Sequence, residues 1–383
     1  MATGTYEGVV TGIPHRDTYQ EMMTAEARML SEGIQFAAYN KSPFTKVLGV
    51  EAWGVDAIKN PKAFGLRGEP RRMLQFTDGG TIKTFDVFAT TGTSAHKGRL
   101  GNFNPSMTEG GSEGSFSWFR LYRGEFIPDV DVQDNAGTAR IHDIKAHKMD
   151  VMKQDVVRDF ALGILGSSSA PDYGVQGPSA LYCDLPNLVS VTQTRTVMNI
   201  ATTNSFWANQ YKAIASIGGG GEMDRPITLR RSLIDLQLDT VQLAESPPTT
   251  DYLQLATKGA WQYLDRLIYA DVVQGGAVMA TKESYDAAGI QNKVFNGAAT
   301  IWDPAVTVPT GATASTEAIY GLPMNHFFVD IKRAENFLVK DWEEPRNHDL
   351  NRTLVAMILC RYCPGLRNRR TFYVAYNMPA CGD

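Results

Sequence analysis

The sequence lacks an excess of charge of either sign. Its 383 residues carry 37 Lys and Arg against 41 Asp and Glu, a formal net charge of -4. The sequence pI is about 5.9, whereas a DNA-binding domain usually has a pI above about 9. Sequence-specific DNA recognition is therefore a poor first interpretation, although a local basic face could still touch DNA non-specifically.

Cysteine is also scarce, with four residues in the whole chain. They are too few to indicate a disulfide framework. Cys360 and Cys363 form a C-x-x-C pair, but a structural zinc site needs four ligands, and the single residues Cys183 and Cys381 do not supply a second pair. A redox pair would begin a helix, whereas Cys360 lies late in an apolar, strand-like run. We expect buried core cysteines and no bound metal.

Long apolar runs are missing as well. No stretch reaches the roughly 18 apolar residues that a membrane-spanning helix needs. The first ten residues are polar and rich in Gly and Thr, without the charged start and apolar stretch of a signal peptide. We therefore expect no membrane partner, and a protein of the cytoplasm or of a particle assembled there.

Catalytic motifs are the last absence. The glycine run 218–221 is followed by Glu222 and Asp224, where a phosphate-binding loop needs Lys and Ser or Thr. We interpret the run as a hinge or loop. His142 and His147 lie five residues apart, which does not match a metalloprotease helix, and no nucleophile elbow occurs. The sequence predicts no catalytic residue, no cofactor and no metal site.

Helical periodicity is strongest in residues 141–165. Apolar residues recur there three or four apart, which indicates one buried helical face: Met149, Met152, Val156, Phe160 and Ile164. Residues 14–40 predict an opening helix that ends before Pro43. Weaker patterns predict three more helices, at 206–217, 226–245 and 252–273.

Residues 71–132 have the character of strands. Asp78-Gly79-Gly80 is a strong turn signal between two strand-like runs. The glycine-rich stretch 98–115 then separates these runs from a third, SFSWFRLYRGEF. We expect an extended, protruding hairpin with a soft tip. Because an isolated two-stranded hairpin is marginally stable in water, a neighbouring subunit is its natural support.

The C-terminal third contains short apolar runs typical of strands. They are KVFNGAATIWDP, FFVDI, TLVAMILCRY and TFYVAYNM, the last two forming an expected pair of closing strands. Long helices combined with one extended hairpin and separate strands predict an α+β fold.

The order of these parts resembles the major capsid proteins of tailed bacteriophages, which have the Hong Kong-type coat fold. The late segments KVFNGAATIWDP, YGLPMNHFFVDI and LVAMILCRYCPGLRNRRTFYVAYN add to the resemblance. It implies an N-terminal arm, an extended hairpin loop, a spine helix with a peripheral domain, a mainly axial region and closing strands that return to the peripheral domain. The implied ranges are 1–70, 71–132, 133–229, 230–352 and 353–383.

The resemblance further implies a major capsid protein that self-assembles into pentamers and hexamers of an icosahedral head enclosing double-stranded DNA. The expected location is the virion, assembled in the host cytoplasm. Expected partners are other copies, a portal, a decoration or cement protein, and packaged DNA through non-specific contact. A long charged N-terminal extension is lacking, so the resemblance implies a separate scaffolding protein or none.

Two sets of residues are candidates for contacts between subunits. The first set lies in the expected hairpin. Its aromatic residues would bury against a neighbour: Phe85, Phe88, Phe116, Trp118, Phe119 and Tyr122. Arg120 and Arg123 lie among them and would pair with acidic groups of that neighbour. The alternative is that the aromatic residues of this set belong to an ordinary sheet core. The second set would pair with carboxylates across an interface, or face DNA: Arg361, Arg367, Arg369 and Arg370.

Two rival functions stay open at this stage. A phage-derived nanocompartment shell would share the fold but enclose cargo enzymes, and neighbouring genes would separate it from a phage head. A soluble enzyme with an unrecognised site would purify as a monomer or dimer and have a large polar pocket.

Overall fold

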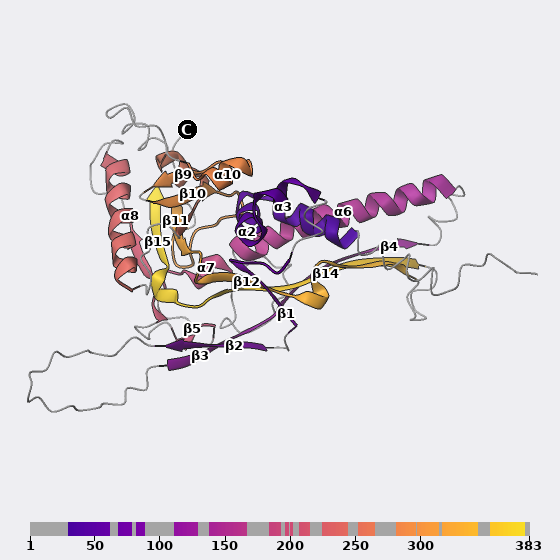
Figure 1. The fold of residues 1–383 in the computed structure, drawn as a ribbon, viewed down its shortest axis with the longest axis horizontal. Helices are drawn as coiled ribbons and strands as arrows, with labels where there is room; N and C mark the ends of the chain where they lie inside the picture. The colour runs from indigo at the N-terminus through magenta and orange to yellow at the C-terminus, as the bar shows by residue number, and fades with distance from the viewer. Residues whose placement is uncertain are drawn as a thin grey trace, which may run out of the picture.

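The computed structural model describes residues 30–61, 68–78, 82–88, 111–128, 138–166, 184–192, 196–198, 200–201, 207–214, 224–243, 252–264, 281–295, 297–313, 316–343 and 353–379. They form the predicted α+β fold, built on one five-stranded and one six-stranded sheet. Figure 1 shows the six-stranded sheet at one end of the molecule, and a long helix with a long strand ribbon reaching toward the other end.

The five-stranded sheet is organised around one long strand, β14. Its strands are β1 (Leu74–Thr77), β4 (Phe119–Pro128), β12 (Phe327–Lys332), β13 (Leu338–Glu343) and β14 (Thr353–Leu366). Leu359 of β14 pairs with Leu338 on one side and Tyr122 on the other, so β13 and β4 flank β14 on opposite edges. The last residues of β14 pair with β12, and β1 adds to β12 in parallel.

The central strands of the six-stranded sheet are buried on both faces. In spatial order its strands are β7 (Gln210–Ala213), β15 (Tyr373–Pro379), β11 (Thr316–Pro323), β8 (Tyr252–Ala256), β10 (Ala298–Trp302) and β9 (Lys293–Phe295). Successive strand residues point to opposite faces. Leu253 and Leu255 accordingly join the main core, whereas Tyr252 and Ala256 pack in a second core with α8 (Asp224–Leu243).

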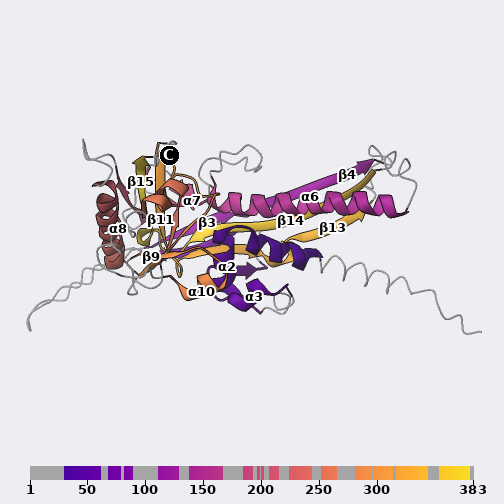
Figure 2. The same cartoon turned by 90° about the horizontal axis from the view of Figure 1, so that it is seen from above.

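Helix α6 (Thr138–Leu165) confirms the strongest periodicity in the sequence. Its five predicted apolar residues are all buried, and it packs along β4 and β14, as Figure 2 shows. The Phe160 ring lies 5.0 Å from that of Tyr362 and 5.3 Å from that of Phe337. Aromatic contacts thus join α6 to the core side of the sheet.

Helix α2 (Pro43–Trp53) follows the helical residues 30–41 after a break at Ser42. Ser42 and Thr45 form a reciprocal capping box at its start, so Pro43 begins one helix as well as ending the previous pattern. The carboxylate of Asp303, buried at the end of β10, accepts the Phe44 backbone N–H at 3.0 Å. The six-stranded sheet therefore supplies a negative charge to the helix N-terminus.

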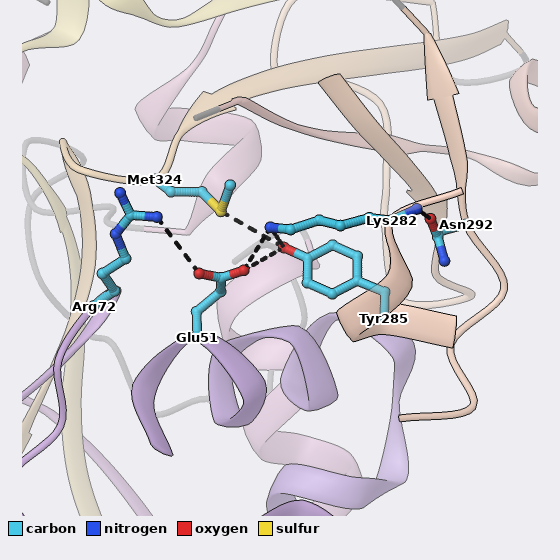
Figure 3. Close-up of polar contacts among 6 residues, drawn as sticks. All are labelled: Glu51, Arg72, Lys282, Tyr285, Asn292 and Met324. Atoms are coloured by element: carbon cyan, nitrogen blue, oxygen red, sulfur yellow. Dashed lines mark hydrogen bonds and ion pairs between the residues drawn. The ribbon is translucent and has the colours of Figure 1, made fainter. Parts of the chain in front are cut away.

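A carboxylate clamp holds the last turn of α2, shown in Figure 3. Glu51 accepts hydrogen bonds from Lys282 Nζ at 2.7 Å and from the Tyr285 hydroxyl at 2.9 Å. Arg72, just before β1, lies 3.7 Å from the other carboxylate oxygen. Burial, then the Glu51 charge, raises the pKa of the Tyr285 hydroxyl far above its usual value. The clamp connects α2, the root of β1 and α10 (Glu283–Ala287).

The predicted ribbon is present but shorter than expected. Strands β2 (Ile82–Phe88) and β3 (Gly111–Ser117) pair in antiparallel register. β1 pairs with β12 and not with β2, so the turn predicted at Asp78 does not join neighbouring strands. The third run continues into β4 of the five-stranded sheet. The predicted tip, 98–115, lies largely outside the described residues.

Two helix predictions were wrong in part. Residues 210–213 of the predicted helix 206–217 form β7, which pairs in parallel with β15. Residues 252–256 of the predicted helix 252–273 form β8, and helix begins only at residue 258. Every residue of β8 is buried, and a short apolar run buried on both faces has no period that separates strand from helix.

The remaining predictions have mixed outcomes. The helix predicted at 226–245 is α8. The two closing strands do not pair with each other, because β14 and β15 belong to different sheets. Short elements complete the description: α3 (Val55–Lys59), α7 (Leu185–Leu188), β5 (Thr196–Val197), β6 (Ile200–Ala201), η4 (Arg333–Glu335) and η6 (Arg369–Thr371). The boundaries of the five implied segments stay predictions.

Candidate assembly surface

The outer part of the five-stranded sheet, formed by β4, β14 and β13, has two unlike faces. One face packs under α6 and is buried, including Leu121 and Ile127 of β4 and Ala356 and Ile358 of β14. These residues alternate along their strands, as expected for a sheet with one core face. The alternating positions between them form the opposite face.

That opposite face is apolar and partly exposed, and we name it the open face. Tyr122 is 63% exposed, Phe126 59% and Leu338 38%. Figure 1 shows α6 on the other side of β4 and β14. Because the register places paired residues on one face, this face also includes Val355 and Met357, which are half-buried, and Leu359, which is buried between its neighbours. Adjoining exposed apolar side chains are typical of an interaction surface.

One end of the open face is basic. Arg120 pairs directly with Arg361 across β4 and β14. The Arg120 guanidinium lies 5.9 Å from the centre of the Tyr122 ring. Arg361 Nε forms an ion pair with Glu335 at 2.5 Å. Lys340, opposite Met357 in the register, is also exposed. The open face therefore joins an apolar area to cations.

The predicted hairpin contacts divide between the two faces. Arg120 and Tyr122 lie on the open face. Phe119 packs toward the core, with its ring 6.2 Å from that of Tyr362, and Trp118 also packs partly buried against the core. Arg123 points to the α6 side, where it lies 3.4 Å from Asp155. For Phe119 and Trp118 the structure favours the alternative interpretation, an ordinary sheet core.

Three predicted contacts lie on the β2–β3 ribbon, whose side chains are outside the described part of the structure. They are Phe85, Phe88 and Phe116. Their predicted role stays a prediction.

The predicted arginine cluster is not one surface. Arg367 is exposed and its guanidinium lies 5.9 Å from the Phe328 ring centre, and Arg370 is half-buried. Arg361 belongs to the basic end of the open face. The fourth arginine, Arg369, is fully buried.

Arg369 corrects the prediction of an interface or DNA-facing role. It donates to the carbonyl oxygens of Leu188 at 2.6 Å and Trp207 at 3.0 Å, and to Ser190 Oγ at 3.2 Å. Burial lowers the pKa of its guanidinium to about 9. The planar fork satisfies three buried acceptors at once, so this arginine holds loops together inside the subunit.

Phe126, Met357 and Leu338 were not predicted as surface residues. Alternation along RLYRGEFIP could have indicated Phe126, because it lies four residues after Tyr122 on the same strand face. Leu338 lies beside Tyr122 only because β13 and β4 both pair with β14, and β14 follows β4 by more than 200 residues in the sequence. No local sequence pattern predicts that contact.

The C-x-x-C cysteines lie inside β14. Cys360 and Cys363 are both fully buried, as predicted. Three residues apart on a strand, they point to opposite faces. Burial raises the pKa of the Cys360 thiol to about 12, and thiolates are the form that binds metals. Across the described ranges, no group of His, Cys, Asp and Glu side chains could hold a metal ion, and no helix is long and apolar enough to cross a membrane.

Comparisons with known proteins give structural likeness only. No family profile matches the sequence, and no curated protein sequence matches it. The cyanophage A-1(L) capsid structure matches with a TM-score of 0.52 at 12% identity, covering 87% of this chain and 92% of that one. The capsid of cyanophage P-SCSP1u matches with a TM-score of 0.48 at 10% identity, covering 81% and 87% respectively.

A virus-like particle from Pyrococcus furiosus also matches, with a TM-score of 0.38 at 8% identity, covering 79% of this chain and 88% of that one. The A-1(L) capsid structure matches over nearly all of both chains and shows the fold. The chain has the Hong Kong-type coat fold found in tailed-phage capsid proteins.

Proposed function

We propose that this protein is a structural subunit of a closed shell, and that it acts by self-association and not by catalysis. The coat fold supports this role, and the observation that carries it is the open face. Large apolar side chains such as Tyr122 and Phe126 are exposed there beside cations, on a rigid sheet backed by α6. Burial of such a face by another copy contributes about 25 cal/mol per Å2 of apolar area.

The parts of the subunit take distinct roles under this proposal. Residues 71–132 are the extended loop, whose β2–β3 ribbon lies on the open face of the next copy. Helix α6 is the spine that stiffens the acceptor sheet. Closed shells need contacts that repeat around rings, and pentamers and hexamers of one chain provide them.

The particle we propose is a tailed-phage head that encloses double-stranded DNA, with residues 1–70 as an arm, 133–229 and 353–383 as the peripheral part, and 230–352 as mainly axial. Its other partners would be a portal, a scaffolding protein and a cement protein. Exposed arginines such as Arg367 would contact packaged DNA without reading sequence. The location follows: the virion, assembled in the host cytoplasm.

The test is to examine the purified protein by sedimentation velocity and negative-stain electron microscopy over a range of concentration and salt. Rings, tubes or closed shells are the expected result. A protein that stays monomeric or dimeric throughout would overturn the proposal. Shells are then isolated from a host that carries the whole gene neighbourhood, and their contents are identified. Enclosed DNA indicates a phage head, and enclosed enzymes indicate a nanocompartment.

A further inference from the structure

A strained three-residue turn lies between α2 and β1. The backbone N–H of Leu74 donates to the carbonyl oxygen of Arg72 at 2.6 Å, so Met73 is the central residue of this turn. Met73 has a φ of 56°. A turn of this size with a positive φ at its centre is rare and strained, and a residue as bulky as methionine seldom adopts such a φ.

Glycine is the residue that adopts a positive φ without strain. The chain has glycine at such a position close by, since Gly54 follows α2 with a φ of 88°. At position 73 it has a methionine instead, and this side chain is buried in the main core. The side chain therefore anchors the turn, while the backbone at the same residue is strained.

Backbone hydrogen bonds hold the turn on both sides. Before it, the Arg71 N–H donates to the carbonyl oxygen of Ala52 in α2 at 3.1 Å. After it, the Met73 carbonyl oxygen accepts the N–H of Val329 in β12 at 2.7 Å. The turn thus joins helix α2 to the β1–β12 strand pair, and a strained residue persists only where its surroundings fix it in this way.

The carboxylate of Glu51 adds a side-chain contact on the α2 side. Its Oε2 atom lies 3.7 Å from Arg72 Nη1, whereas its Oε1 atom accepts from Lys282 and Tyr285 at 2.7 and 2.9 Å. Figure 3 shows Arg72 on the opposite side of this carboxylate from Lys282 and Tyr285. The Arg72 contact is the longest of the three, and the Arg72 side chain is 37% exposed. It can therefore break while the other two contacts keep Glu51 in place.

We propose that residues 72–74 form a strained hinge with two states, and that the Glu51–Arg72 ion pair holds it closed. In the closed state, which the structure shows, Met73 has a positive φ and β1 lies against α2. In the open state Arg72 leaves Glu51, Met73 relaxes to a negative φ, and the Val329 N–H loses its acceptor. β1 then changes its angle to α2 while Glu51 stays bound to Lys282 and Tyr285.

The strain at Met73 sets the balance between the two states. It opposes the ion pair, so opening costs less than the broken contacts alone would require. Hinges are commonly a few residues at the ends of elements that absorb a change in φ and ψ, and Met73 directly precedes β1. The inference goes beyond the proposed function, because the hinge belongs to a single subunit and needs no second copy.

Amide hydrogen exchange on the full chain measures the opening, at a concentration where sedimentation velocity finds single subunits. The reporter is the Val329 amide, which is bonded to Met73 only in the closed state, and the amides of β14 are the internal reference. Arg72→Gln removes the ion pair and should speed exchange at Val329 about fivefold. The Leu74 amide should accelerate by the same factor, because one opening breaks both hydrogen bonds. Arg71→Gln, at the exposed neighbouring position, should change neither rate.

A comparison of Ala and Gly at position 73 isolates the strain, because both variants remove the methionine side chain and only glycine accepts the positive φ freely. Met73→Gly should exchange about fivefold more slowly at Val329 than Met73→Ala does. Leu74 is the matched position, since it is equally buried and has no positive φ. There the order should be reversed, with Leu74→Gly exchanging faster than Leu74→Ala.

Three results would overturn the hinge. One is a Met73→Gly protein that exchanges at Val329 as fast as Met73→Ala or faster. Another is an Arg72→Gln protein with unchanged rates, or with β14 amides accelerated as much as Val329, because the ion pair would then act on the whole fold. The third is acceleration at only one of the two reporter amides. If the variants at position 73 do not fold, Arg72→Gln decides the matter alone. These rates do not depend on assembly, so the hinge and the proposed function can fail separately.

Discussion

The hydroxyl group of Tyr362 on β14 occupies the space in which a side chain at Gly163 on α6 would begin. Gly163 is therefore required for the close approach of the long helix to the sheet, although it lies in a helix where glycine is unfavourable. This contact fixes how α6 supports the back of the open face.

We expect Gly163→Ala to lower stability by about 1–3 kcal/mol, because the added methyl overlaps Tyr362 and overpacks a dense core. Thermal or urea unfolding measures the change. Gly33→Ala is the matched control, because position 33 is helical and open on that side. That change should be neutral or stabilising by up to about 1 kcal/mol. Tyr362→Phe, which removes the hydroxyl, should restore part of the loss. Equal effects at both glycines would contradict the contact.

The carboxylate clamp predicts that Glu51→Gln destabilises the fold by about 2 kcal/mol, because Lys282 and Arg72 lose their shared charge partner. Glu283→Gln, at an exposed position on α10, should change stability by less than about 0.5 kcal/mol. Urea unfolding of the two variants side by side provides the measurement. A Glu51→Gln protein as stable as the control would show that the clamp contributes nothing.

Replacement of Arg369 by Met should cost about 3 kcal/mol or more, because buried carbonyl groups of Leu188 and Trp207 would lose their donors. Arg369→Lys should recover only part of this loss, since an ammonium group cannot match the planar fork. Arg367→Met is the control at an exposed position and should be close to neutral. Comparable losses at 367 and 369 would argue against the internal role of Arg369.

Cysteine reactivity tests the burial of β14. With the pKa of Cys360 near 12, its thiol stays protonated at pH 8 in the folded protein and should resist alkylation. In the unfolded chain it titrates near pH 8.5. Between those values only the unfolded state loses the proton, so this group lowers folding stability as pH rises. Peptide mapping after brief labelling should find Cys360 modified only in denaturant, and rapid native labelling would contradict the buried strand.

The open face predicts that Tyr122→Ser with Phe126→Ser weakens self-association by about tenfold or more, because large aromatic side chains dominate interface energies. Folding should be retained, since both rings are mainly exposed. Tyr211→Ser is the control, an exposed tyrosine on β7 at the edge of the other sheet. Sedimentation velocity reports association and circular dichroism reports folding. Loss of association in the control alone would place the contact elsewhere.

Local sequence patterns were sufficient to predict an element where one of its faces is buried and the other is exposed to solvent. The spacing from Met149 to Ile164 identified α6 for that reason. The pattern failed at residues 252–256, because β8 is buried on both faces and carries no alternation. It failed at β7 because a parallel partner more than 150 residues away decides that segment's conformation.

The candidate surface was predictable only in part, for a related reason. Tyr122 and Arg120 lie in an aromatic, basic run that is visible in the sequence. Which of these side chains face outward depends on the register with β14, a long-range pairing. The arginine cluster shows the same limit, because four basic residues close in sequence turned out to include one core residue, Arg369.

β14 is fourteen residues long and is common to both ends of the five-stranded sheet. Its first part carries the open face, and its last part pairs with β12, which pairs in turn with β1 at the root of the β2–β3 ribbon. Under the proposed assembly, a neighbour bound on the open face would therefore contact the same strand that holds the root of the hairpin in place. In a ring of such subunits, binding at one contact would orient the hairpin that forms the next contact. Ring closure would then be cooperative.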